Sequence, residues 1–154
     1  MSRDAWLVLH VLGVVIFLGN IIVTAVWKLL ADRTRDARVV AYAQRLVTVT
    51  DIAFTATGAA LIAISGPVLA DDFGGVGGPA WITWGLALFI ASGVIWVAVL
   101  IPVQVLQARA ARRFATGGAI PESYWRLAWV WYVFGSVAIL LPLANLYFMV
   151  FKPD

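Results

Sequence analysis

Four long apolar runs constrain the fold of this chain more than any other feature of its sequence. Each run has the roughly 20 consecutive apolar residues that an α-helix needs to cross the hydrocarbon core of a bilayer. Because that core offers no water to free backbone groups, such runs cross it as helices. The predicted spans cover residues 5–31, 46–70, 80–107 and 123–151, and the helix of the second span is expected to begin as early as residue 37.

The amino-acid composition also indicates that the chain lies in a lipid bilayer. Hydrophobic residues make up 63% of the 154 residues and charged residues only 12%. A soluble domain is about 45–50% apolar and about 25% charged, and a small domain buries only about two-thirds of its surface. We therefore predict an all-α membrane protein in a lipid bilayer, with four transmembrane helices in an antiparallel up-down bundle because the loops are short.

The basic residues predict an orientation. Two loops carry arginines, whereas the loop at residues 71–79 has no Lys or Arg. The positive-inside rule places the arginine loops in the cytoplasm and both termini outside, so in a bacterial inner membrane the termini are periplasmic. The net charge of +3 does not indicate nucleic acid, because these residues flank the spans. They are Arg33, Arg35, Arg38, Arg109, Arg112 and Arg113.

His10 is the single histidine and lies one to two turns inside the outer end of the first span. It shares a helix face with Gly13, Phe17 and Asn20. Ionisable groups inside a membrane are costly and tend to face the bundle interior, which suggests an axial haem b ligand or a proton-handling group. The alternative is a neutral histidine hydrogen-bonded to a neighbouring helix. Met149 lies at a comparable depth and is a conceivable second haem ligand.

Two asparagines are candidate neighbours of His10. Asn145 lies about two turns from the outer end of the fourth span, so a hydrogen bond to His10 is expected. Asn20 lies near the middle of the membrane and must find a partner there, because no water is available. Trp96 is at a similar depth, and its indole N–H needs an acceptor.

A second polar group, Arg45, Asp51, Gln104 and Arg126, is expected on the cytoplasmic side. An ion pair of Asp51 with Arg126 or Arg45 would offset the cost of burying the carboxylate. The alternative is an acid near a helix N-terminus with arginines at the interface.

Other residues refine the predicted bundle. Lys28 is expected to reach the interface by snorkelling, and Asp32 to begin a solvated loop. The second span carries many small residues, including Gly58, which predicts close helix packing. Pro102 and Pro142 are expected to kink their spans.

Several catalytic and metal-binding patterns are absent from the sequence. The chain has no cysteine, which excludes thiolate ligands and a cysteine nucleophile, and we predict no metal site. No phosphate-binding loop, HExxH motif, nucleophile elbow or run of intramembrane acids occurs. These absences argue against an ordinary hydrolase or a secondary transporter.

Short segments along nearly the whole chain are specific in their order and spacing. They cover residues 9–13, 17–19, 51–55, 96–104, 124–127 and 148–153. On these segments the chain resembles the predicted bacterial integral membrane proteins called domain of unknown function 2269. The resemblance implies a membrane protein and no particular activity.

A more distant resemblance concerns haem and copper. His10, Phe17 and the Lys152-Pro153 ending are similar to HemJ-type protoporphyrinogen oxidases, and the overall pattern is similar to CopD-like copper resistance domains. Residues 81–85 depart from the HemJ pattern, which has a His and a Lys there, so the resemblance implies haem binding and not the oxidase activity. One histidine and two methionines are a poor copper ligand set.

Three functional hypotheses follow. The first is a non-enzymatic multi-pass protein of unknown molecular function, such as an accessory subunit that packs against a larger membrane protein complex or a second copy of itself. The second is a haem b redox protein with His10 as axial ligand. The third is a proton or small-molecule pathway through Asp51, Asn20 and His10.

Overall fold

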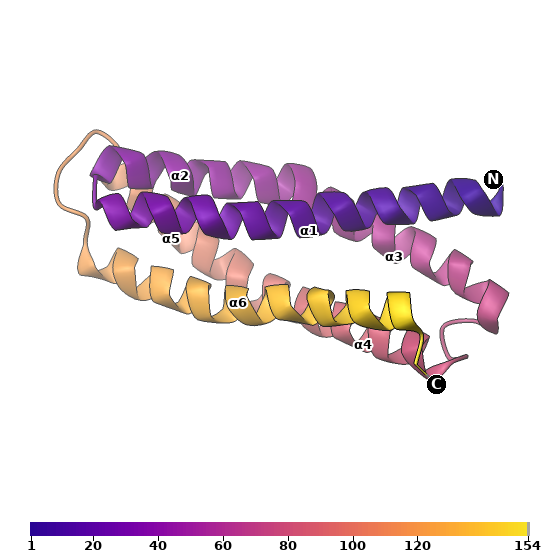
Figure 1. Cartoon of the computed structure of the whole chain (residues 1–154). Coiled ribbons are helices and arrows are strands. Elements are labelled where there is room, and N and C mark those ends of the chain that lie inside the picture. The colour runs from indigo at the N-terminus through magenta and orange to yellow at the C-terminus, as the bar shows by residue number, and fades with distance from the viewer. Residues whose placement is uncertain (154) are drawn as a thin grey trace.

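The structure is a computed structural model that describes residues 1–153, and every regular element in that range is helical. Four rods run side by side and alternate in direction (Figure 1). They cover Arg3–Thr34, Ala37–Phe73, Ala80–Phe114 and Glu122–Phe151, and each is long and apolar enough to cross a membrane. The predicted all-α fold with four spans is confirmed.

The first rod is a single helix, α1 (Arg3–Thr34). The hydroxyl of Ser2 caps its start by accepting the backbone N–H of Ala5. Its end is fixed by Arg35 in the left-handed region, with φ of 54°. Asp36 then caps the next helix by accepting from the N–H groups of Arg38 and Val39, which explains how the chain reverses within two residues.

The second and third rods are each interrupted by a wide π-helical turn. The second consists of α2 (Ala37–Thr50), the π-turn η1 (Asp51–Ala56), α3 (Thr57–Ala70) and the 3₁₀ turn η2 (Asp71–Phe73). The third consists of α4 (Ala80–Ile95), the π-turn η3 (Trp96–Leu100) and α5 (Ile101–Phe114). Such turns are rare and are frequently found at functional sites.

The two prolines expected to disturb their spans behave differently. Pro102 has no N–H to donate, and the α-helical hydrogen bonds give way to η3 just before it. The fourth rod, α6 (Glu122–Phe151), continues as one helix through Pro142.

The helices pair differently at the two ends of the bundle. Near the arginine loops α2 packs on α1 and α5, and α5 packs on α6. Towards the termini α1 packs on α3 and α4 packs on α6, whereas α3 and α4 make almost no contact. The closest approach joins α1 to α3, because a Cβ on Gly58 would lie 2.7 Å from the backbone N of Phe17 and 2.8 Å from the carbonyl O of Gly13.

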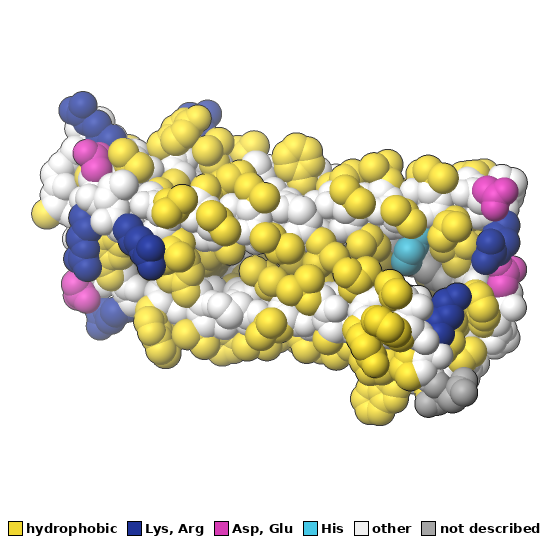
Figure 2. Space-filling view, in the orientation of Figure 1, with side chains coloured by type: hydrophobic (Ala, Val, Ile, Leu, Met, Phe, Trp, Pro, Cys, Tyr) yellow, Lys and Arg dark blue, Asp and Glu magenta, His cyan; other side chains and the backbone are white. Residues whose placement is uncertain are grey.

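The two ends of the bundle also differ in charge. Lys and Arg side chains gather at the end that carries the loops after α1 and α5 (Figure 2). At the opposite end the Arg3 Nε atom lies 2.5 Å from Asp72 Oδ2, which ties the start of α1 to η2. Lys152 lies there over the rings of Phe73 and Trp81.

Candidate functional site: a carboxylate beside an intramembrane cavity

Asp51 opens η1 and is buried in the middle of the bundle. Its Oδ2 accepts a hydrogen bond of 2.5 Å from Gln104 Nε2 on α5. Its Oδ1 accepts from Thr55 Oγ1 at 2.9 Å and from Asn20 Nδ2 at 3.3 Å. All these donors are neutral, and Asp51 has no ion-pair partner within residues 1–153. The carboxylate is therefore held by dipoles alone.

Asn20 organises the α1 side of this group. Its Nδ2 also donates to Thr55 Oγ1 at 2.8 Å and to the carbonyl of Thr50 at 3.3 Å. Its Oδ1 accepts from Thr24 Oγ1 at 3.3 Å, one helical turn further along α1. Asn20 thus has the partners that its depth in the membrane requires.

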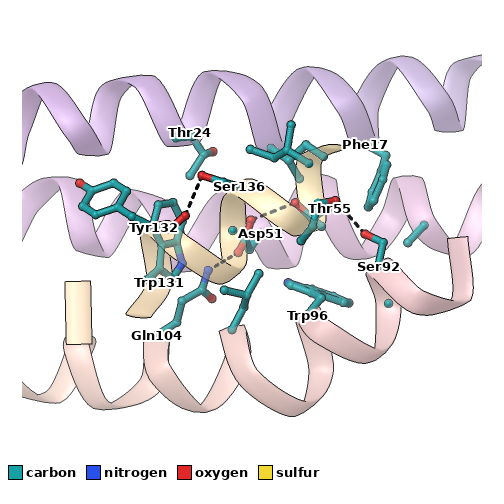
Figure 3. A pocket seen from close by; sticks show the side chains of 18 of the residues that line it. Phe17, Thr24, Asp51, Thr55, Ser92, Trp96, Gln104, Trp131, Tyr132 and Ser136 are labelled. Atoms are coloured by element: carbon teal, nitrogen blue, oxygen red, sulfur yellow. Dashed lines mark hydrogen bonds between the residues drawn. The ribbon is translucent and has the colours of Figure 1, made fainter. Parts of the chain in front are cut away.

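A cavity of about 100 Å³ lies directly beside Asp51 (Figure 3). Most of its wall is apolar, and its polar side chains include Thr24, Asp51, Thr55, Ser92, Gln104 and Ser136. Gly93 and Gly135 also face it, and a Cβ added to either would meet nothing within 4 Å. The cavity has room for several water molecules or for one small organic group. Its apolar lining includes Phe17, Ile21, Ala25, Phe89, Leu100 and Ile139.

The two π-turns bring the polar groups of the second and third rods to this cavity. Asp51 and Thr55 belong to η1, whereas Trp96 opens η3 on the third rod. A π-turn holds an extra residue compared with an α-turn, so it shifts the side chains that follow it around the helix axis. In this chain both shifts occur at the depth of the cavity.

Two indole N–H groups at the cavity make no hydrogen bond of normal length within residues 1–153. The Nε1 atoms of Trp96 and Trp131 are buried, and both side chains line the cavity. The Trp96 indole is directed at the Asp51 carboxylate, whereas Trp131 Nε1 has no acceptor near it. Buried donors without an acceptor are rare, so a ligand or water that accepts from them would be favoured at this position. Apolar walls with a few convergent polar groups are typical of small-molecule sites. Sequence reasoning identified the unmet need of Trp96 but missed Trp131.

A second buried polar group, the Lys28 cluster, consists of Lys28, Asp32, Tyr124 and Tyr132. Lys28 is 0% exposed, and its Nζ lies 2.8 Å from Asp32 Oδ2 and 3.1 Å from the Tyr124 hydroxyl. The ring centroids of Tyr124, Trp131 and Tyr132 lie 5.2, 5.6 and 5.7 Å from Nζ. Such rings attract a desolvated cation. The expectation that Lys28 snorkels to the interface is therefore wrong, as is the solvated loop expected at Asp32.

Tyr132 links the Lys28 cluster to the cavity. Its hydroxyl donates to Asp32 Oδ2 at 2.8 Å, while its side chain lines the cavity. A sequence signal for this arrangement exists, because Asn20, Thr24, Lys28 and Asp32 recur at intervals of four along one face of α1. The candidate site residues of α1 thus form one stripe.

The ion pairs considered for Asp51 are not formed. Arg45 and Arg126 are both exposed, and neither contacts Asp51 among the residues described. Arg45 precedes Asp51 by six positions, so the two side chains point about 120° apart around the helix axis. Asp51 also lies deeper than expected, at the level of Asn20. Of the predicted cluster, Asp51 and Gln104 come together and the two arginines do not.

His10 lies apart from the cavity. Its Nδ1 is 3.0 Å from Ser65 Oγ, whose own proton goes to the Leu61 carbonyl at 2.5 Å. Nδ1 is therefore the protonated nitrogen, and Nε2 carries the free lone pair. The structure thus gives His10 the hydrogen bond between helices that the sequence offered as one alternative.

The expected hydrogen bond between His10 and Asn145 is not formed. His10 contacts α3, whereas Asn145 Oδ1 and Met149 lie against Gly85 of α4. The α1–α3 and α4–α6 pairs diverge in this half of the bundle, which separates these side chains. The role of His10 as a haem ligand stays a prediction.

Comparison with known proteins agrees with this architecture. A family model described as "Predicted integral membrane protein (DUF2269)" matches residues 5–153. The resemblance found on the short sequence segments is thereby confirmed. No curated protein and no solved structure matches the chain.

Proposed function

Since the chain belongs to the DUF2269 family of predicted integral membrane proteins, we propose that its function is to bind a small amphipathic molecule inside the bilayer. The binding site is the cavity beside Asp51. The ligand has an apolar body and a head group that carries a protonated amine or a similar strong hydrogen-bond donor.

The observation that carries this proposal is the Asp51 carboxylate without a cation. An ionised carboxylate accepts about four hydrogen bonds, and the protein supplies three, from Gln104, Thr55 and Asn20. The Trp96 indole is also directed at this carboxylate, and none of the four donors carries a positive charge. In a medium of low dielectric constant a cation placed beside Asp51 is attracted far more strongly than in water.

The two indoles support the same conclusion. A ligand or its bound water can accept from Trp131 Nε1, which has no acceptor within residues 1–153, and can compete with Asp51 for Trp96 Nε1. The apolar wall suits the body of the molecule. A site with one acceptor and two donors favours a head group that both donates and accepts.

The packing supports binding over a proton pathway that reaches His10. The rings of Phe17 and Phe89 meet edge to face at 6.2 Å between the two regions. The close contact of Gly13 with Gly58 also lies on α1 between His10 and Asn20. Neither feature offers a polar group to carry a proton.

Tryptophan fluorescence of the protein in lipid nanodiscs tests the proposal, because Trp96 and Trp131 line the cavity. Butylammonium, butanol and butyrate differ in charge but hardly in size. We expect saturable quenching by butylammonium, weaker quenching by butanol and none by butyrate. Asp51→Asn should lower the butylammonium affinity at least 10-fold, the cost of losing one charge-assisted contact.

Asp71→Asn is the matched control, because Asp71 is an exposed acid at the end of the same rod. The Asp71→Asn variant should bind butylammonium with the same affinity as the unmodified chain. Equal quenching by the three probes, or unchanged butylammonium binding in Asp51→Asn, would contradict the proposed function.

We also propose that the arginine-rich end faces the cytoplasm of a bacterial inner membrane and that the termini are periplasmic. The gathering of Lys and Arg at one end supports this orientation (Figure 2). Because the chain has no cysteine, Val76→Cys and Ala119→Cys can be labelled in intact cells with an impermeant maleimide. Labelling of Val76→Cys alone is expected, and the reverse pattern would overturn the orientation.

A further inference from the structure

We infer that the cavity beside Asp51 opens sideways into the bilayer between α3 and α4, and that its ligand is a membrane-dissolved amphiphile whose alkyl tail lies in this opening. The inference rests on the proposed function and names the class of ligand and its route. It distinguishes a molecule that arrives from the lipid from one that arrives from water.

A groove on the membrane-facing side supplies the opening. It runs between α3 and the α4–η3 segment, and its lining has no charged residue. Four residues, Ala59, Phe89, Gly93 and Trp96, line both the groove and the cavity. The two spaces therefore adjoin along a common wall. The groove is completed by Ala60, Ala63, Ile90, Val94, Val97 and Ala98.

The packing of the helices explains why the groove is open. In this half of the bundle α3 is held by α1 and α4 by α6, so the facing sides of α3 and α4 stay largely unpacked. The α3 side of the groove carries only the small residues Ala59, Ala60 and Ala63, and the α4 side includes Gly93. A Cβ on Gly93 would meet nothing within 4 Å, so no side chain fills the space there.

The two routes into the cavity along the bundle axis are less suitable for an alkyl tail than the sideways route. Toward the arginine end the Lys28 cluster occupies the interior with hydrogen-bonded, buried side chains. Toward the termini Phe17 and Phe89 meet edge to face. The sideways route passes only apolar side chains, which a hydrocarbon tail can contact without losing hydrogen bonds.

This geometry specifies the occupant. The head group of the ligand reaches the Asp51 carboxylate, which has no cationic partner in residues 1–153, and the tail leaves past Gly93 into the groove. A long-chain primary ammonium ion has both features. A short ammonium ion of the same charge fills the cavity and leaves the groove empty.

The absence of cysteine allows a direct test. Ala63→Cys in the groove is labelled with N-benzylmaleimide, and Val15→Cys, exposed on α1, is labelled as the control. Stopped-flow tryptophan quenching in nanodiscs then follows dodecylammonium and butylammonium. The groove label should slow the association of both probes at least 10-fold. At equilibrium the groove label should lower the affinity for dodecylammonium at least 10-fold and leave the affinity for butylammonium unchanged. The Val15 label should change neither the association rates nor the affinities.

The outcomes separate the two proposals. If the unlabelled protein shows no Asp51-dependent binding, the proposed function fails. If Asp51-dependent binding persists but the groove label changes neither rate nor dodecylammonium affinity, the sideways route alone is overturned. Gly93→Val narrows the groove without any label and should slow the association of both probes in the same way. This variant tests the sideways route independently if the labelled protein misfolds.

Discussion

The side-chain amide of Gln104 donates a 2.5 Å hydrogen bond to Oδ2 of Asp51 and so joins α5 to η1 across the bundle. Both residues are buried, at 6% and 7% exposure. The bond aims the carboxylate and keeps one of its oxygens beside the cavity. Asp51 therefore depends on a residue 53 positions later in the chain for its orientation.

Gln104→Leu removes this donor and leaves Asp51 Oδ2 without a protein partner. We expect the free energy of unfolding to fall by about 1–3 kcal/mol, the cost of an unsatisfied buried acceptor. Reversible unfolding in mixed micelles, followed by circular dichroism, measures the change. Gln104→Glu should be worse, because it places two carboxylates together. A Leu variant as stable as the unmodified protein would show that this bond does not hold the site.

Gly135→Leu should fill the cavity from α6, because a Cβ at Gly135 meets nothing within 4 Å and the residue lines the cavity. Butylammonium binding should disappear, while stability is kept or raised because the new side chain gains contacts. Tryptophan quenching and thermal unfolding give the two readouts. Gly19→Leu is the control, since Gly19 is an exposed helical glycine with equally free space. Retained binding in Gly135→Leu would place the ligand elsewhere.

Lys28→Met leaves Asp32 buried without its cation. Removing one partner of a buried ion pair costs about 3–5 kcal/mol, whereas replacing both partners by apolar groups is often nearly neutral. We therefore expect Lys28→Met to be strongly destabilised and Lys28→Met/Asp32→Leu to recover most of the loss in the same unfolding assay. A double variant no more stable than Lys28→Met would mean that the pair is not the source of the effect.

Gly58→Val should separate α1 from α3, because its Cβ would lie 2.7 Å from the backbone N of Phe17. The backbone cannot yield as a flexible side chain could, so we expect a loss of stability of about 2 kcal/mol or more, in the range of overpacked cores. Gly19→Val serves as the comparison on an open helix face. If the two valines cost the same, the α1–α3 contact is looser than described.

Hydropathy was sufficient to predict the four spans, because their length and apolar content follow from the bilayer alone. It also located Asp51, Asn20 and Gln104, since polar residues stand out in apolar runs. Hydropathy could not place Asp51 at the correct depth, because the π-turns η1 and η3 change the rotation of their helices and leave no clear pattern in the sequence. The angle between Arg45 and Asp51 around the helix axis could be calculated from the sequence. Whether the two side chains meet also depends on the depth of Asp51.

The Lys28 cluster shows a different limit. The interval of four between Lys28 and Asp32 is visible in the sequence, but their burial depends on Tyr124 and Tyr132. These rings come from α6, about 100 positions further along the chain. A lysine near the end of a span normally snorkels, and only the packing of α6 over it changes that outcome. The missed residues are thus those whose environment is made by distant segments.

The weak contact between α3 and α4 leaves one end of the bundle divided into two helix pairs. The arginine end is clamped by packing among all four rods, whereas the other end consists of two helix pairs that share few contacts. Lateral pressure from the surrounding lipid acts directly on the space between those pairs. Lipid packing that pushes α3 and α4 together would reduce the volume of the cavity beside Asp51. We therefore expect the room for a ligand there to fall as the lateral pressure of the surrounding bilayer rises.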